Sequence, residues 1–255
     1  MLRLGLAICA LAATLTAAWG NYCAASLCGE SKHIACNNNG AWASSCPKKD
    51  YAPIMITMDI DKRSIMVRAH NSRRNYLARG KLPGFAAAKR MATMRWSSEL
   101  AKIAAYNVRQ CAMKHDACRN TKQFKSSGQN LAIMSYTGNR NARTDEEMLA
   151  QSVTMWWNEY KDTTMAQMRK YPSNYKGPAI GHFTAMMQQT NMALGCAAAR
   201  YKDATYHNFL VACNYATTNI IGRAVYTDGA TASGCTKGKN PNYAGLCHVD
   251  EVFSV

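Results

Sequence analysis

The stretch Asn208-Phe209-Leu210-Val211-Ala212-Cys213-Asn214-Tyr215 closely follows a second apolar stretch, residues 192–200. Both stretches are short, and the polar Lys202-Asp203 lies between them. This pattern predicts two β-strands, residues 192–200 and 208–215, joined by a turn. Cys196 and Cys213 would lie on these two strands and could bridge them.

Upstream of the strands, two segments have the apolar spacing of α-helices. The first ends before Gly80 and Pro83 and carries on one face Met66, Val67, His70, Arg74 and Leu77. The second follows Trp96 and repeats Leu100, Ile103, Ala104 and Cys111.

Two further helices are predicted after these. Thr144 and Glu147 have the spacing of a capping box, and acidic residues in a first turn suit the helix dipole. The apolar face of that third helix consists of Leu149, Val153, Trp156 and Tyr160. A short fourth helix starts near His182. Helices combined with antiparallel strands predict an α+β fold.

The first 20 residues have the layout of a secretory signal peptide. A short basic start, Met1-Leu2-Arg3, precedes an apolar run over residues 4–15 and small residues up to Gly20. The run is too short for a transmembrane helix, which needs about 20 residues, and no later stretch is long and apolar enough to cross a membrane. We expect cleavage after Gly20, or after Ala18, and a secreted, extracellular protein. The alternative is a buried N-terminal helix.

Cysteine parity supports export. The chain has 11 cysteines, of which Cys9 lies in the predicted signal peptide. The other ten are Cys23, Cys28, Cys36, Cys46, Cys111, Cys118, Cys196, Cys213, Cys235 and Cys247. An even number in an exported chain indicates disulfides, although their pairing cannot be read from spacing. Zinc binding is the rival interpretation, but zinc sites usually contain Cys-x-x-Cys pairs, and no two of these cysteines are that close.

Composition divides the mature chain into a Cys-rich N-terminal segment (21–55), one domain with the periodic segments (56–226) and a short Cys-containing tail (227–255). Without Arg3, 30 Lys and Arg residues stand against 15 Asp and Glu residues, a net charge of about +15. This charge favours anionic partners such as glycosaminoglycans or acidic lipid surfaces, although a solubilising basic surface is the simpler explanation. No nucleic-acid-binding module is recognisable, so no specific nucleic acid is expected.

Five short motifs together resemble the CAP superfamily (cysteine-rich secretory protein, antigen 5, pathogenesis-related 1). They are His70-Asn71-Ser72-Arg73-Arg74, Gly128-Gln129-Asn130-Leu131, Trp157-Asn158-Glu159, Gly181-His182-Phe183-Thr184 and Phe209–Tyr215. They occur in the family's order over roughly residues 57–226. The N-terminal cysteines and the Cys235…Cys247 tail are similar to the insect antigen 5 branch, which includes venom allergen-like and salivary proteins. Two positions depart from the family pattern: Gln188 replaces the usual Trp, and Thr218-Asn219-Ile220 replaces a Gly-Asn.

The resemblance implies an α-β-α sandwich (the CAP/SCP fold) with disulfide-stapled N-terminal loops and a short C-terminal tail. It also implies the bridges Cys23–Cys36, Cys28–Cys118, Cys46–Cys111 and Cys196–Cys213, which leaves Cys235–Cys247. The further cysteine-rich domain of the vertebrate venom-type branch is missing from this sequence, so ion-channel blocking is not expected.

The resemblance also implies a cleft lined by two histidines and two acids, which correspond to His115, Gln129, Glu159 and His182. Two imidazoles and carboxylates can hold zinc or copper, and His115 and His182 would be the ligands. Gln129 replaces one acid and lacks its charge, which weakens metal binding and removes a paired-acid mechanism. The alternative, which we favour, is a hydrogen-bonded polar cluster that ties the helices to the sheet.

Catalytic residues are hard to find. His70 lies on the apolar face of a helix, where a hydrogen-bonded core histidine is expected. Ser126, Ser127 and Ser135 lie near the cleft residues in sequence, but no Gly-x-Ser-x-Gly or His-Glu-x-x-His motif surrounds a nucleophile. If every mature cysteine is paired, no thiol nucleophile remains, and we expect no enzyme activity.

Three functions follow as hypotheses. The first is an extracellular binding protein, since CAP relatives carry sterols, fatty acids or eicosanoids, or act on host proteins. The second is a zinc- or copper-dependent protein that uses the histidine pair. A protease is the third and weakest. Adhesion through Arg-Gly-Asp is not expected, because the chain lacks that tripeptide.

Overall fold

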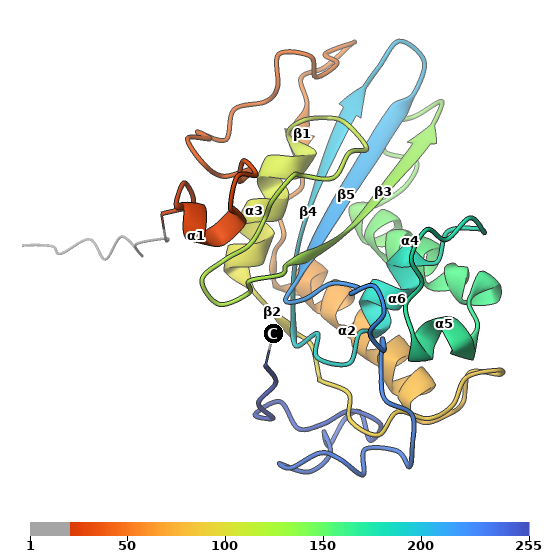
Figure 1. The fold of residues 1–255 in the computed structure, drawn as a ribbon. Coiled ribbons are helices and arrows are strands. Elements are labelled where there is room, and N and C mark those ends of the chain that lie inside the picture. Colours follow the sequence, from red (N-terminus) through yellow and green to blue (C-terminus); the bar gives the residue numbers. More distant parts are fainter. Residues whose placement is uncertain (1–20, 255) are drawn as a thin grey trace, which may run out of the picture.

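The computed structural model describes residues 21–254, so the predicted signal peptide lies outside the described residues. Its centre is a sheet in the order β1 (Ile54–Met55), β4 (Ala193–Lys202), β5 (His207–Tyr215) and β3 (Gly128–Tyr136). These strands pair antiparallel, while the short β2 (Arg95–Trp96) pairs parallel with β4. Figure 1 shows the long β3, β4 and β5 side by side. The predicted strand pair is therefore confirmed.

Helices cover both faces of this sheet, as the α-β-α sandwich requires. One face carries α3 (Ser98–Val108), whose Ala104 and Val108 pack on Leu131, Ala197, Ala199, Leu210 and Ala212. The helix approaches closely because Gly195 has no side chain: an added Cβ would lie 2.1 Å from the backbone nitrogen of Ala101. Figure 1 shows α3 on one side of the strands and the other long helices on the opposite side.

The opposite face carries the larger core. It is covered by α2 (Ile60–Ala78), α4 (Asp145–Asn158), α5 (Met165–Arg169) and α6 (Gly181–Met187). The largest fully buried side chains of this layer include Trp156, Phe183, Phe209 and Met66. The predicted inner face of the first helix is largely confirmed, because Met66, His70, Arg74 and Leu77 are buried and Val67 is half-buried.

Short polar signals set the ends of these elements. The predicted capping box is present: Thr144 accepts from the backbone of Glu147, and the Glu147 side chain accepts from the backbone of Thr144. The predicted turn after β4 is also present, because Asp203 accepts from the backbone of Thr205 and Tyr206.

Two helix boundaries were predicted too long. We expected Cys111 on the second helix, but α3 ends at Val108, and Cys111 has a left-handed backbone with φ 52°. We expected Tyr160 on the third helix, but α4 ends at Asn158, and Tyr160 lies in the 3₁₀-helix η1 (Glu159–Asp162). In both cases apolar spacing continued past the residue at which the backbone leaves the α-helix.

Four of the five disulfides hold the segments outside the sandwich, and the fifth lies within its sheet. The N-terminal segment, with the one-turn α1 (Ala25–Cys28), is closed by Cys23–Cys36 and joined to the domain by Cys28–Cys118 and Cys46–Cys111. Cys196–Cys213 connects β4 and β5, and Cys235–Cys247 closes the tail. These are the pairs that the family resemblance implies.

Candidate functional site

Glu159 and His182 form the first pair of the candidate site. Glu159 follows the end of α4, and its Oε2 accepts from the backbone nitrogens of His182 (2.8 Å) and Phe183 (3.0 Å) at the start of α6. Its Oε1 accepts from the His182 Nδ1 at 2.5 Å. The carboxylate thus satisfies N–H groups that have no partner within α6. It joins the end of α4 to α6.

His115 and Gln129 form the second pair. The Gln129 Nε2 donates to Asp116 Oδ2 (2.7 Å) and Asn214 Oδ1 (3.0 Å). Its Oε1 must therefore be the atom that accepts from the His115 Nδ1, at 2.8 Å. This arrangement places the proton of a neutral His115 on Nδ1 and leaves Nε2 as a lone-pair acceptor.

Asp116 explains why an amide stands at position 129. The Asp116 side chain is fully buried. It accepts from Asn107 Nδ2 at 2.7 Å, from Gln129 and, more distantly, from Arg119 Nε at 3.4 Å. A glutamate at position 129 would place a second carboxylate against it, and two adjacent carboxylates repel one another. No sequence pattern indicates that Asp116 belongs to the site, although it directly follows His115.

Gln129 and Asn130 point to opposite faces of β3, because neighbouring strand residues point to opposite sides. Gln129 contacts Asn214, which in turn donates to the α3 carbonyl of Leu100 at 3.2 Å. Asn130 instead donates to the His182 carbonyl at 3.0 Å and to Tyr215 Oη at 3.1 Å. The four predicted cleft residues thus come together as two separate hydrogen-bonded pairs.

This arrangement does not bring together the three or more protein ligands that a zinc site usually has. Within residues 21–254, no group of three or more His, Cys, Asp or Glu side chains is placed to hold one. Gln129 also commits its amide nitrogen to Asp116 and Asn214, and its oxygen to His115. We therefore derive no chemistry through zinc or copper at His115 and His182.

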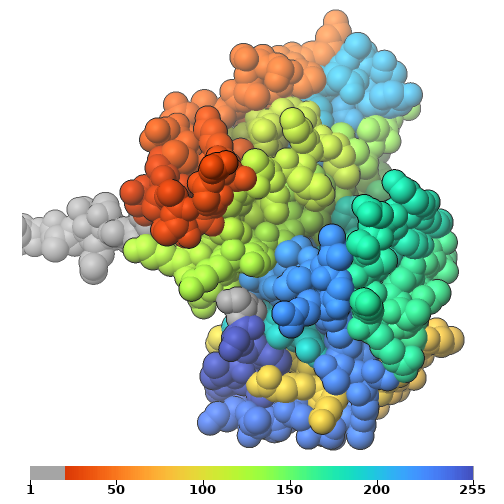
Figure 2. Space-filling model, in the orientation of Figure 1, coloured from red at the N-terminus to blue at the C-terminus, as the bar shows by residue number. Residues whose placement is uncertain are grey.

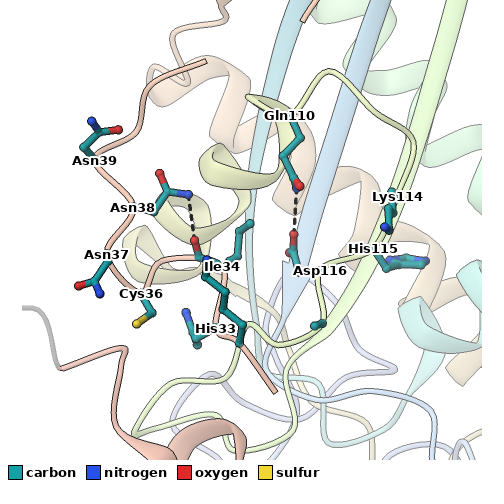
Figure 3. A pocket seen from close by; sticks show the side chains of 12 residues that line it. His33, Ile34, Cys36, Asn37, Asn38, Asn39, Gln110, Lys114, His115 and Asp116 are labelled. Atoms are coloured by element: carbon teal, nitrogen blue, oxygen red, sulfur yellow. Dashed lines mark hydrogen bonds between the residues drawn. The ribbon is translucent and has the colours of Figure 1, made fainter. Parts of the chain in front are cut away.

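A pocket of about 680 Å³ opens beside the second pair, between the N-terminal segment and the 110–117 loop. Figure 3 shows Asn37, Asn38 and Asn39 on one side of it and Gln110, Lys114 and His115 on the other. Its other lining residues are Lys32, His33, Ile34, Cys36, Asp116 and Ala117. Amide and ammonium side chains make up half of the lining, so a ligand in this pocket would find several polar groups to bind.

His33 in this pocket is locked as a neutral side chain. Its Nδ1 accepts from the backbone of Ala35 at 3.0 Å, so its Nε2 donates to the Asn120 carbonyl at 2.8 Å. Burial lowers the pKa of His33, which also favours the neutral form. His33 therefore has a structural role in the pocket wall.

A second hollow lies on the α5 side of the molecule. This groove of about 570 Å³ is lined by Ala166, Gln167, Lys170, Tyr171, Pro172, Ser173, Ile221 and Gly222. Two backbone hydrogen bonds of 2.8 Å, Tyr171 N–H to Arg223 and Gly222 N–H to Tyr171, hold its two walls together. Asn219 connects the second wall to the start of α6 by donating to the Gly181 carbonyl at 3.0 Å.

The other candidate residues have structural environments. His70 is fully buried, its Nδ1 donates to the Met66 carbonyl at 2.7 Å, and its Nε2 accepts from the Tyr215 hydroxyl at 2.9 Å. Burial lowers the pKa of His70 to about 4, so the predicted core histidine is confirmed. Ser127 donates to the Tyr215 carbonyl and Ser135 to Asn208 Oδ1, not to a histidine.

Arg74 has a role that the sequence did not reveal. It is fully buried, and its guanidinium donates to the carbonyls of Ala92, Met186 and Gln188 at 2.7 to 3.2 Å. Burial lowers its pKa to about 9, so Arg74 remains charged at neutral pH. It holds α2 against the loops before β2 and after α6.

Fold and site define a disulfide-rich α-β-α sandwich that carries two hydrogen-bonded pairs, His115 with Gln129 and His182 with Glu159. The family described as "CAP: Cysteine-rich secretory protein family" matches residues 67–215, more than half of the chain. The chain belongs to this CAP family, and its relatives are antigen 5-like.

Two relatives and one solved structure illustrate this. "Venom allergen-1" of Aedes aegypti is 40% identical over 230 residues, which cover 90% of this chain and 88% of that protein. "Antigen 5 like allergen Cul n 1" of Culicoides nubeculosus is 39% identical over 175 residues, covering 69% and 77%. The structure titled "Crystal structure of NaASP2 with Zn2+" aligns with a TM-score of 0.60 at 24% identity, covering 74% of this chain and 96% of that one. This last likeness supports the fold alone.

Proposed function

We propose that this protein is a secreted, non-enzymatic binding protein for a small apolar ligand, and that a fatty acid is the class that fits best. The observation that carries the proposal is the groove of about 570 Å³ between α5 and the 219–223 loop. Ligand pockets are usually about 300 to 1,000 Å³ and mostly apolar, with a few polar groups that orient the ligand.

The groove lining supports a fatty acid over a neutral lipid. Ala166, Tyr171, Pro172 and Ile221 supply apolar surface. Lys170 also lines the groove and supplies an ammonium group that can pair with a carboxylate. A sterol or another neutral lipid would leave this cation without a partner. An acidic eicosanoid shares the carboxylate and belongs to the same class.

The histidine pairs argue for binding rather than catalysis. Each imidazole is hydrogen-bonded to its own partner, Gln129 or Glu159. Gln129 stands where the family resemblance implies a second acid, so the four cleft residues supply one carboxylate, that of Glu159, and no paired-acid mechanism. All ten cysteines of the described region are in disulfides, which removes thiol chemistry from that region.

Secretion is part of the proposal. The disulfide framework suits an oxidising compartment, and the two relatives above are named as allergens, one of them a venom allergen. Within residues 21–254, none of the helices has the length and apolarity needed to cross a membrane. The signal peptide prediction for residues 1–20 agrees with this assignment.

The test is ligand recovery from protein purified without detergent. We expect organic extraction and mass spectrometry to release a fatty acid or related carboxylate. We also expect the stripped protein to take up fatty acid saturably in buffer without membranes. If no lipid is recovered and fatty acid uptake does not saturate, the proposal is wrong.

A further inference from the structure

Two adjacent isoleucines occupy the tip of the loop that follows β5. Ile220 is 47% exposed and Ile221 is 65% exposed. Arg223 N–H donates to the Ile220 carbonyl at 3.0 Å, and Gly222 has φ 77°, so the backbone folds into a tight turn at this point. Isoleucine is among the residues most often buried, so a pair on an exposed turn requires a reason. We call Ile220 and Ile221 the isoleucine tip.

The tip lies beside a second exposed segment, residues 170–176. The backbone hydrogen bonds between Tyr171 and residues 222 and 223 hold the two segments together. In Figure 2 the blue surface after β5 adjoins the green-to-teal surface that includes α5, on one face of the molecule. Tyr175, which is 39% exposed, adds an aromatic ring to this face.

The charge around the tip is entirely positive. Neither residues 163–180 nor residues 204–227 contain an Asp or a Glu. Lys170, Lys176 and Arg223 are exposed in these segments. The nearby Arg169 pairs with Asp228 at 2.8 Å, which neutralises that acid. The face therefore combines exposed apolar side chains with unneutralised cations.

We propose that this face docks on an anionic lipid surface. The isoleucine tip would enter the boundary between headgroups and acyl chains, and Lys170, Lys176 and Arg223 would contact acidic headgroups. Apolar side chains flanked by lysine and arginine bind membrane interfaces in this way, and tyrosine is enriched at the same depth. This docking rests on the proposed function and extends it. Ile221 also lines the groove, so docking would bring the opening of the groove to the lipid bilayer, from which a fatty acid can enter.

Lipid suits this face better than a protein partner. Stable protein interfaces bury about 1,200 to 2,000 Å² and are depleted in lysine. The apolar part here is two side chains on a projecting turn, flanked by two lysines. A bilayer needs no complementary pocket, only an apolar tip and cations at the same level.

Vesicle co-sedimentation tests the proposal with the mature protein and no added fatty acid. We expect binding to vesicles of phosphatidylcholine with phosphatidylserine, weakening with salt, and much weaker binding to phosphatidylcholine alone. Ile220→Ser, which lies outside the groove lining, should lower the partition coefficient about fivefold. The matched control Ile60→Ser removes an isoleucine that is 81% exposed at the start of α2 and should change nothing.

Two double variants test the contribution of the positive charges. Lys176→Gln with Arg223→Gln should weaken binding more than Lys81→Gln with Arg68→Gln, which removes the same charge from α2 and the turn after it. Absence of binding to acidic vesicles would overturn the proposal and favour a protein partner. Equal losses for Ile220→Ser and Ile60→Ser would show that the isoleucine tip does not enter the bilayer. Equal losses for the two charge pairs would reduce the effect to net charge, and either result would overturn the proposal. Fatty acid uptake without vesicles is measured separately, so either proposal can fail alone.

Discussion

Gln129 and Asp116 show how one side chain changes the chemistry of a family cleft. The family pattern places an acid at position 129. In this chain the buried Asp116 already supplies the carboxylate, and Gln129 satisfies it while also accepting from His115. The cleft thus keeps its hydrogen bonds, and at position 129 an amide stands in place of a charged group.

Gln129→Glu should therefore destabilise the protein at neutral pH, although it restores the family residue. Leaving a buried charged group without a donor costs about 2 kcal/mol or more. Repulsion by Asp116 raises the pKa of the new carboxyl above its value in the unfolded chain. The loss in free energy of unfolding is therefore complete above that raised pKa, and it becomes smaller as pH falls and the carboxyl is protonated. Urea unfolding at pH 7 and pH 5 measures both the loss of stability and its dependence on pH. Gln123→Glu, at an exposed position, is the control and should show neither.

The role of a residue could be predicted where its position on an apolar helix face, or within a short motif, determined that role. His70 lies on an apolar helix face, and burial followed from that position. The roles of Asp116, Arg74 and His33 could not be predicted, because the partners that define them lie 9 to 114 residues away and include backbone carbonyls. A charged residue in a helix pattern, such as Arg74, gives no indication that its partners are the carbonyls of distant loops.

At the scale of elements, local signals predicted local structure. The capping box at Thr144 and the polar turn at Asp203 are short-range features, and both are present. The long strand β3 was not predicted as a strand. It begins with the buried polar residues Gln129 and Asn130, whose burial depends on partners from α6, β5 and the 116 loop. Because these first residues are polar, this segment lacks the apolar pattern from which a strand is predicted.

The C-terminal tail contains an acid-sensitive contact. The Glu251 side chain is fully buried. Burial alone would raise its pKa, but donation from the backbone of Thr236 and Lys237 and from the side chains of Arg90 and Thr236 lowers it to about 2, below its ordinary 4.5. Since the folded pKa is the lower one, this contact stabilises fully above about pH 4.5 and its contribution falls as pH drops toward 2.

Glu251→Gln should therefore reduce stability at pH 7, and the stability of this variant should fall less steeply as pH is lowered. Thermal unfolding between pH 6 and pH 2 checks this, with Asp250→Asn as the control because Asp250 is an exposed neighbour. A variant whose stability falls as steeply with acid as that of the natural protein would show that Glu251 does not carry the effect.

At the scale of the whole molecule, disulfides fix the parts that the sandwich does not hold. Cys28–Cys118 spans 90 residues and Cys235–Cys247 spans 12. In the chain-entropy account a longer closed loop gives more stability. The Cys46–Cys111 bridge lies inside the first loop and shortens it to roughly 25 residues, so the expected contributions are about 3.5 against about 3 kcal/mol. The family resemblance predicts this pairing correctly, whereas cysteine spacing alone leaves it open because many pairings share the same spacing.

Removing the first bridge should therefore cost more than removing the second. Cys28→Ser with Cys118→Ser is expected to lower the free energy of unfolding more than Cys235→Ser with Cys247→Ser, and to loosen the pocket of about 680 Å³ beside Ala117. Chemical denaturation and hydrogen exchange of residues 32–39 measure the two consequences. Equal losses from both pairs would contradict this ranking.

A variant that fills the groove between α5 and the 219–223 loop tests whether a fatty acid binds there. Ala166→Trp places a large ring in the groove, while Ala150→Trp makes the same change at an exposed helical alanine on α4. In a titration with a fluorescent fatty acid, we expect Ala166→Trp to weaken binding about tenfold or more and Ala150→Trp to leave it unchanged. Equal affinity in the natural protein and both variants would show that the fatty acid does not bind in this groove.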